Sequence, residues 1–146
     1  MSMSEGANAG AAAAPKRLLV VDDALFMRRL IRDVAAEAGW AVAGEAANGE
    51  EAVALYAQLR PDLVTMDLVM PVMGGLEALR RIRAGDPEAR VIVVTALDQK
   101  QSLMDSIRDG AIDFIVKPFD RDRVVRLLRK LGDESNTGTL PGAGGA

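Results

Sequence analysis

The sequence predicts an α/β fold in which five strand–helix units, (βα)5, form one doubly wound parallel sheet. Five short apolar runs are separated by segments with helical periodicity. Most of these runs are continuous rather than alternating, as expected for strands that are buried on both faces of a parallel sheet. Regular alternation of strands and helices requires crossover connections, and these place helices on both faces of the sheet.

Strand candidates and helix candidates alternate along the chain. The first helix carries apolar side chains on one face from Met27 to Ala38 and is expected to stop at Gly39. The second is expected to begin at the capping residue Asn48 and to stop before Pro61. The expected strands are residues 17–21, 41–43, 63–66, 91–95 and 114–116, and the later helices are marked by Leu76, Leu79 and Ile82, by Leu103 and Ile107, and by Val124, Leu127, Leu128 and Leu131.

These elements predict one folded domain. Residues 16–132 contain all of them, which is enough chain for a domain with its own core. Right-handed crossovers leave few strand orders, and we expect the flavodoxin-like order 2-1-3-4-5, which is known from other α/β proteins rather than derived from these residues. Residues 1–15 are Ala-rich without a basic start and predict a flexible leader, whereas residues 133–146, rich in Gly, Ser and Thr, predict a disordered tail.

The composition excludes several classes of function. The 146 residues contain no histidine and no cysteine, which rules out disulfides, thiolate or histidine metal sites, and a histidine general base. The net charge of −3 gives no bulk attraction to nucleic acid. No apolar stretch is long enough for a transmembrane helix, so no membrane partner is expected. Carboxylates, hydroxyls and lysine remain as the groups for chemistry.

Three carboxylates follow strands that this topology places side by side. Asp22 and Asp23 end the first strand, and Asp67 ends the third. Ligands bind at the carboxyl ends of strands where the strand order reverses, which here lies between these two strands. Crowded like charges repel, so the cluster predicts a bound cation, and oxygen ligands without His or Cys favour Mg²⁺. Taken separately, Asp22 and Asp23 also fit a helix N-cap, and Asp67 fits an acid of the loop before Pro71.

A hydroxyl and an ammonium group are expected at the same sheet edge. Thr95, followed by the small Ala96, ends the fourth strand, and Lys117 follows the fifth. Both groups can bind phosphoryl oxygens. Each residue alone also fits a plain role, Thr95 as a β-branched strand residue and Lys117 as a solvated loop lysine. The combination of acids, hydroxyl and ammonium is the specific signal.

Four segments resemble the receiver domain of two-component response regulators. They are LVVDDALFMR, DLVTMDLVMPVMGG, VVTA and DFIVKPF. The resemblance extends from Arg17 to about Leu131 and is closest to the single-domain, CheY-like regulators of chemotaxis. It implies a cytoplasmic phosphoacceptor switch, rather than an enzyme in the usual sense, that a CheA-like histidine kinase phosphorylates.

The resemblance implies metal-assisted phosphoryl transfer to Asp67. This residue would be the phosphoacceptor and would receive the group from a phosphohistidine of the kinase. Asp23 would bind Mg²⁺ directly and Asp22 mainly through water, while Asp67 and the backbone carbonyl of Val69 would complete the protein ligands. General chemistry agrees, because phosphoryl transfer needs alignment and charge neutralisation more than a base, and an Asp nucleophile gives an acyl phosphate.

The resemblance also implies a conformational switch. Lys117 would pair with Asp67 and then with the phosphoryl group, and its bond to Pro118 would be cis. Thr95, beside Ala96, would hydrogen-bond the phosphoryl group, and Phe114 would rotate into the space that Thr95 leaves. For Phe114, a plain core aromatic is the alternative.

Three positions depart from the usual receiver pattern. Polar residues often stand two positions after the phosphoacceptor and after the threonine, but here those positions hold Val69 and Leu97. Apolar side chains cannot orient an attacking water, so we expect slow loss of phosphate unless a phosphatase supplies a polar group. The alternative is that both side chains pack against a partner. At the switch position, Phe114 lacks the hydroxyl of the frequent Tyr.

Output is expected through the surface of the fourth helix, fifth strand and fifth helix, because few residues follow Leu131. A flagellar motor switch or another motility target is the expected partner. A phosphorelay to a histidine phosphotransferase, a phosphorylation-independent interaction module and a small enzyme are the alternatives, the last being weakest because no G-x-G-x-x-G follows the first strand. A docking stripe for an acidic partner, or a solvated face, is formed by Arg121, Arg123, Arg126, Arg129 and Lys130.

Overall fold

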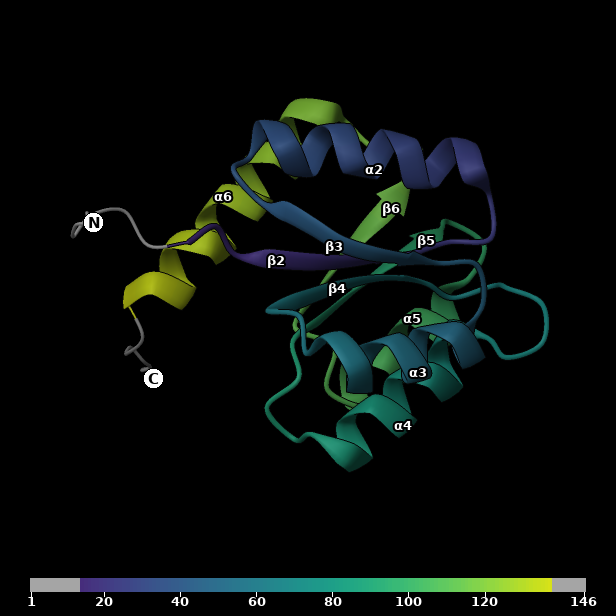
Figure 1. Cartoon of the computed structure of the whole chain (residues 1–146). Helices are drawn as coiled ribbons and strands as arrows, with labels where there is room; N and C mark the ends of the chain where they lie inside the picture. Colours follow the sequence, from purple (N-terminus) through teal and green to yellow (C-terminus); the bar gives the residue numbers. More distant parts are fainter. Residues whose placement is uncertain (1–13, 138–146) are drawn as a thin grey trace.

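Parallel strands form the centre of the molecule. The computed structural model describes residues 14–137, and within them one five-stranded parallel sheet has the order β3-β2-β4-β5-β6 (Figure 1). Counted along the chain this order is 2-1-3-4-5, so the predicted flavodoxin-like topology is confirmed. The strands are β2 (Arg17–Val21), β3 (Ala41–Ala46), β4 (Leu63–Asp67), β5 (Val91–Ala96) and β6 (Asp113–Lys117).

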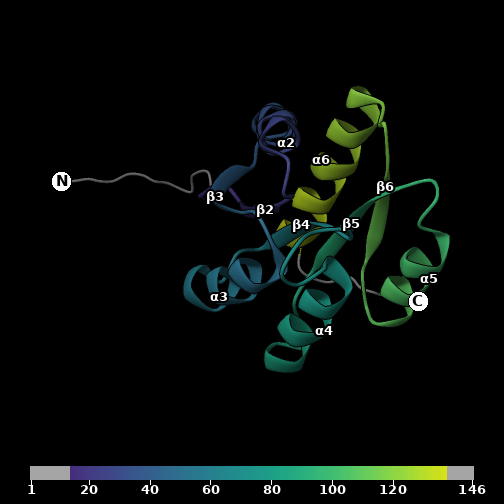
Figure 2. The same ribbon diagram turned by 90° about the vertical axis from the view of Figure 1, so that its right-hand side faces the viewer.

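Helices cover both faces of the sheet. Helices α2 and α6 lie on one face, while α3, α4 and α5 lie on the other (Figures 1 and 2). None of the helices within residues 14–137 has the length and apolar character needed to cross a bilayer. The helices are α2 (Leu25–Glu37), α3 (Gly49–Leu59), α4 (Gly75–Gly85), α5 (Lys100–Arg108) and α6 (Arg121–Thr137).

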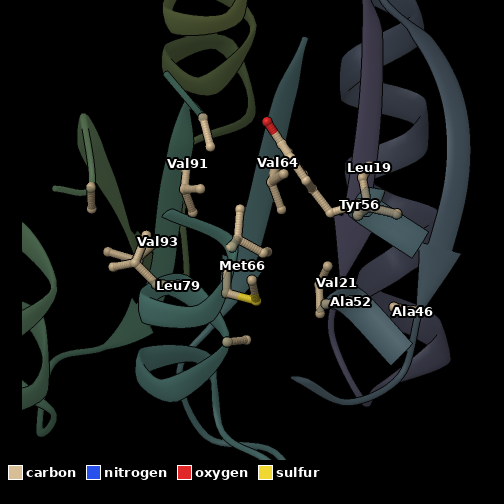
Figure 3. Packing of buried hydrophobic residues seen from close by; sticks show 14 of the residues in the cluster. Leu19, Val21, Ala46, Ala52, Tyr56, Val64, Met66, Leu79, Val91 and Val93 are labelled. Carbon is tan, nitrogen blue, oxygen red and sulfur yellow. The ribbon is translucent and has the colours of Figure 1, made fainter. Parts of the chain in front are cut away.

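The continuous apolar strands supply two cores, one on each side of the sheet. In β2, Leu18 and Val20 face α2 and α6, whereas Leu19 and Val21 face α3 and α4. Figure 3 shows the second core, in which Met66 of β4 packs near Leu79 of α4. Because alternate residues of a strand point to opposite faces, a strand covered on both sides must be apolar throughout, as the sequence pattern indicated.

Local signals set most of the element boundaries. Asn48 caps α3, since its side chain accepts a hydrogen bond of 2.9 Å from the N–H of Glu51. Gly39 and Gly110 follow α2 and α5 with φ of 91° and 107°, the left-handed conformation that glycine adopts easily. Strand β3 is longer than predicted because it continues through the polar Glu45 at the half-buried edge of the sheet.

Helix α6 is also longer than the sequence suggested. It continues to Thr137, past Gly132, where the folded domain was expected to end. Gly132 stays helical and lies against Trp40. A Cβ added at Gly132 would stand 3.5 Å from Trp40 Nε1. Trp40 Nε1 also donates a hydrogen bond of 2.8 Å to the carbonyl of Leu128, so α6 is tied to the sheet at this end. Apart from residues 14, 15 and 133–137, the predicted leader and tail lie outside the described residues.

Candidate functional site

The sheet brings three carboxylates together at the carboxyl ends of β2 and β4. These strands pair in register with Val21 opposite Met66, so the next residues, Asp22 just after β2 and Asp67 at the end of β4, lie side by side. One oxygen each from Asp22, Asp23 and Asp67 lies within 4.8 Å of the others. Asp22 and Asp67 are buried and Asp23 is exposed. The predicted convergence of the three acids is therefore present.

Asp22 is fixed through both its backbone and its side chain. Its N–H donates to the carbonyl of Ala46 at 3.0 Å, and its carbonyl accepts a hydrogen bond of 2.7 Å from Arg28 Nη1. Its carboxylate accepts from the N–H of Ala24 at 2.9 Å and from Lys117 Nζ at 2.9 Å. A buried carboxylate with this many partners is held in one orientation.

The N-cap alternative for the paired acids does not hold. The N-cap residue of α2 is Ala24, and no side chain caps that helix. Asp22 instead accepts a hydrogen bond within the turn that precedes the helix. Both acids therefore remain available to a ligand at the sheet edge.

Lys117 reaches into the acidic cluster from the end of β6. Its Nζ lies 2.9 Å from Asp22 Oδ2 and 3.5 Å from Asp67 Oδ1, so its closer partner is Asp22 rather than the expected Asp67. Burial alone would lower the pKa of Lys117, but the hydrogen bond to Asp22 and the charges of both carboxylates raise it above its usual value. The peptide bond between Lys117 and Pro118 is cis, in agreement with the expectation.

The surroundings of Asp67 disfavour its negative charge and so favour a bound cation. Burial and the charge of Asp22 raise the pKa of Asp67 to about 6, against the opposing effects of Lys117 and of the N–H of Val69. A divalent cation would remove this penalty, and a set of carboxylate oxygens without nitrogen or sulfur suits Mg²⁺. The residues present thus fit a magnesium ion.

The remaining predicted side chains lie on β5 and β6, the two strands that follow β4 in the sheet. Ala96 pairs with Lys117, and the preceding Thr95 is buried, with its Oγ1 donating a weak hydrogen bond of 3.3 Å to the Ala96 carbonyl. Phe114 is 44% exposed, which contradicts the alternative of a plain core aromatic. In this conformation, therefore, Thr95 lies inside and Phe114 outside.

Sequence reasoning missed two glycines that hold the loop after Asp67 against the strand. The N–H of Gly75 donates to the Leu68 carbonyl at 3.0 Å, and a Cβ on Gly75 would lie 2.0 Å from the Asp67 carbonyl oxygen. The N–H of Gly49 donates to the Met73 carbonyl at 2.8 Å, where a Cβ would also collide. The pair of glycines in VMGG was the signal available for the first contact.

Four apolar side chains close in sequence to the site residues are exposed. Val69 and Leu97, the two positions that depart from the usual pattern, are 58% and 75% exposed. Phe26 in the first turn of α2 and Val72 in the loop after β4 are also exposed. Neither Val69 nor Leu97 is therefore buried in the core.

Residues 18–129 match the response regulator receiver domain family. The chain belongs to this family. It is 51% identical to the chemotaxis protein CheY of Thermotoga maritima over 80% of this chain and 97% of the relative. It is 50% identical to CheY of Listeria monocytogenes over 78% of this chain and 96% of the relative. A CheX–CheY–BeF3–Mg²⁺ complex from Borrelia burgdorferi contains a similar fold, with a TM-score of 0.75, 35% identity, and coverage of 86% of this chain and 91% of that one.

A CheY-like receiver domain is a module of two-component signalling. Such domains are signalling switches rather than enzymes in the usual sense. The acidic cluster, the lysine and the buried threonine of this receiver domain stand together at the edge where its fold places a ligand site.

Proposed function

We propose that this chain is a cytoplasmic, CheY-like response regulator in which Mg²⁺-dependent phosphorylation of Asp67 by a histidine kinase switches binding to a target of chemotaxis or motility. The observation that supports this most is the meeting of three carboxylates within 4.8 Å, with Lys117 at hydrogen-bond distance from one of them. Acids in that number at one strand edge, with an ammonium group beside them, suit a metal and a phosphoryl group.

Asp67 is the nucleophile of the proposed reaction. Its carboxylate oxygen attacks phosphorus, the P–N bond of the donor phosphohistidine breaks, and the imidazole leaves, giving an acyl phosphate on Asp67. Asp22, Asp23, Asp67 and the carbonyl of Val69 would hold Mg²⁺, which neutralises phosphoryl oxygens when bound. Deprotonated Asp67 is required for attack, and its raised pKa of about 6 leaves it mainly ionised at neutral pH.

Lys117, Thr95, Ala96 and Phe114 form the proposed response to the phosphoryl group. Lys117 would exchange part of its contact with Asp22 for a phosphoryl oxygen. Within residues 14–137 the Thr95 hydroxyl makes one weak hydrogen bond, to its neighbouring carbonyl, so it can turn toward a new acceptor while the small Ala96 leaves room beside it. Phe114, now exposed, would then move inward.

Phosphoryl uptake is the direct test. The intact mass of the protein is measured after incubation with phosphoramidate, with and without Mg²⁺, beside the Asp67→Asn variant. We expect one added phosphoryl group, which requires both Mg²⁺ and Asp67. The absence of an adduct from a folded protein under all conditions would contradict the proposal and favour a phosphorylation-independent binding module.

The proposed output surface consists of α5, β6 and α6. Apolar side chains are exposed there, and a cavity of about 380 Å³ lies between β6 and α6, bordered by Phe114, Pro118 and Arg123. Of the helix α6 cations, Arg121 pairs with Glu37, whereas Arg123, Arg126 and Lys130 are exposed. A motor switch protein or another motility target with acidic and apolar side chains would fit this surface. The exposed apolar side chains are Met104, Ile107, Ile112 and Phe114.

Val69 and Leu97 are expected to prolong the phosphorylated state, and a phosphatase is the expected partner that ends it. Replacing both in a Val69→Asn, Leu97→Glu variant places polar groups beside the path of an attacking water. The half-life of the acyl phosphate, followed by mass after removal of the donor, should fall roughly tenfold or more, as for other water-positioning groups. A Phe26→Gln variant, which changes another exposed apolar residue near the site, is the control. An unchanged half-life in the double variant would contradict this role.

A further inference from the structure

Arg28 links the acidic turn to the edge strand. It lies in the first turn of α2, and its side chain is only 16% exposed. Nη1 donates a hydrogen bond of 2.7 Å to the backbone carbonyl of Asp22, and Nε donates one of 3.0 Å to Glu45 Oε1 on β3. One planar guanidinium therefore joins the turn after β2 to the neighbouring strand.

Glu45 is a strong anchor for this guanidinium. The hydrogen bond from Arg32 is the largest effect and lowers the pKa of Glu45 below its usual range; burial opposes it, and the hydrogen bond and charge of Arg28 add to the lowering. Arg32 and Arg28 are one helical turn apart on α2 and share this single carboxylate. Of these two arginines, Arg28 also donates a hydrogen bond to the carbonyl of Asp22.

The turn that Arg28 holds carries two of the three clustered acids. Asp22 is tied down by several hydrogen bonds, but the Asp23 side chain makes none with any residue in the described part of the chain. The position of the Asp23 carboxylate therefore depends on the backbone between Asp22 and Ala24. Losing the hydrogen bond from Arg28 to the Asp22 carbonyl would remove one of the hydrogen bonds that fix this backbone.

We propose that Arg28 is a positioning residue for the cation site, acting through the Asp22 carbonyl to hold the carboxylates of Asp22 and Asp23 in place for Mg²⁺. This role rests on the proposed function of the site. The positive charge of Arg28 by itself disfavours a nearby cation. Its positional effect and its charge thus predict opposite results on removal, so the two can be separated by experiment.

The test compares variants of the two arginines that share Glu45. Arg28→Lys keeps the charge but cannot bridge two acceptors with a fixed planar group, and Arg28→Gln removes the charge as well. Arg32→Gln is the matched control, because it breaks a bond to the same Glu45 without touching Asp22. Mg²⁺ is titrated into metal-free, ¹⁵N-labelled protein, and its Kd is taken from the shifts of the Asp23 and Ala24 amide resonances.

Both Arg28 variants should bind Mg²⁺ about tenfold more weakly, the scale found when partners of metal ligands are removed, while Arg32→Gln stays within about twofold. Phosphorylation by phosphoramidate should be slow in the Arg28 variants at low Mg²⁺ and should recover at saturating Mg²⁺, a rescue that a misfolded variant would not show.

Three results would overturn the role of Arg28. They are an unchanged or tighter Kd in the Arg28 variants, an equal weakening in Arg32→Gln, and a phosphorylation defect that saturating Mg²⁺ leaves in place. If wild-type protein neither binds Mg²⁺ nor accepts a phosphoryl group, the proposed function itself fails, and the role of Arg28 fails with it.

Discussion

The Gly75→Ala variant is expected to unfold at a much lower denaturant concentration than the wild type and to accept phosphoryl groups poorly. A Cβ at this position would lie 2.0 Å from the carbonyl oxygen of Asp67 and 2.9 Å from the Cα of Leu68. Both neighbours are backbone atoms, so the collision cannot be relieved by a side-chain rotation. Either α4 or the end of β4 must move, at a cost of about 3 kcal/mol or more.

Urea unfolding followed by circular dichroism measures this loss, and Gly85→Ala is its matched control. Gly85 is the last residue of the same helix, and nothing lies within 4 Å of a Cβ there. Alanine at that site should leave the free energy of unfolding unchanged or raise it by up to about 1 kcal/mol, because alanine favours the helix. Equal free energies of unfolding for the two variants would contradict this prediction, because α4 could then move away from Asp67 without loss of stability.

The Asp67→Asn variant is expected to be more stable than the wild type at pH 7 in the absence of divalent cations. Burial and the charge of Asp22 raise the pKa of Asp67 from 3.8 to about 6. The folded protein therefore binds more protons than the unfolded chain between about pH 4 and pH 6, and wild-type stability falls as the pH rises through this window. Asparagine does not ionise, so the variant escapes a cost on the order of 2 to 3 kcal/mol at pH 7.

Thermal unfolding at a series of pH values tests this expectation. The difference in melting temperature should be largest above pH 6 and should vanish below about pH 4, where Asp67 is protonated in both states of the wild type. Added Mg²⁺ should raise the melting temperature of the wild type more than that of the variant. Asp33→Asn, at an exposed position of α2, is the control. A difference that does not change with pH would contradict the raised pKa of Asp67.

The sequence was sufficient for the parts of the site that follow from topology. Parallel strands end at one edge of the sheet, so acids after the first and third apolar runs had to meet once those strands were neighbours. The continuous apolar character of β2 and β4 likewise required helices on both faces.

What the sequence did not show depends on contacts between distant residues. The preference of Lys117 for Asp22 over Asp67 is a difference between 2.9 Å and 3.5 Å, which side-chain packing decides. The bond from Arg28 to the Asp22 carbonyl involves a backbone acceptor, and no residue type marks that acceptor in a sequence. Where α6 continues past Gly132, it lies against Trp40, a residue far away in the chain.

Strand β6 is a short strand at the edge of the sheet. It is the last strand of the sheet, and in the described part of the chain it pairs with β5 and no other strand, so a displacement disturbs one ladder of hydrogen bonds. Lys117 at its end touches the acids, and Phe114, three residues earlier, borders the cavity beside α6. At the rise of a strand the two residues are about 10 Å apart, and their odd spacing places them on opposite faces. If a phosphoryl group displaced Lys117, as we propose, the same short strand would also carry Phe114 with it.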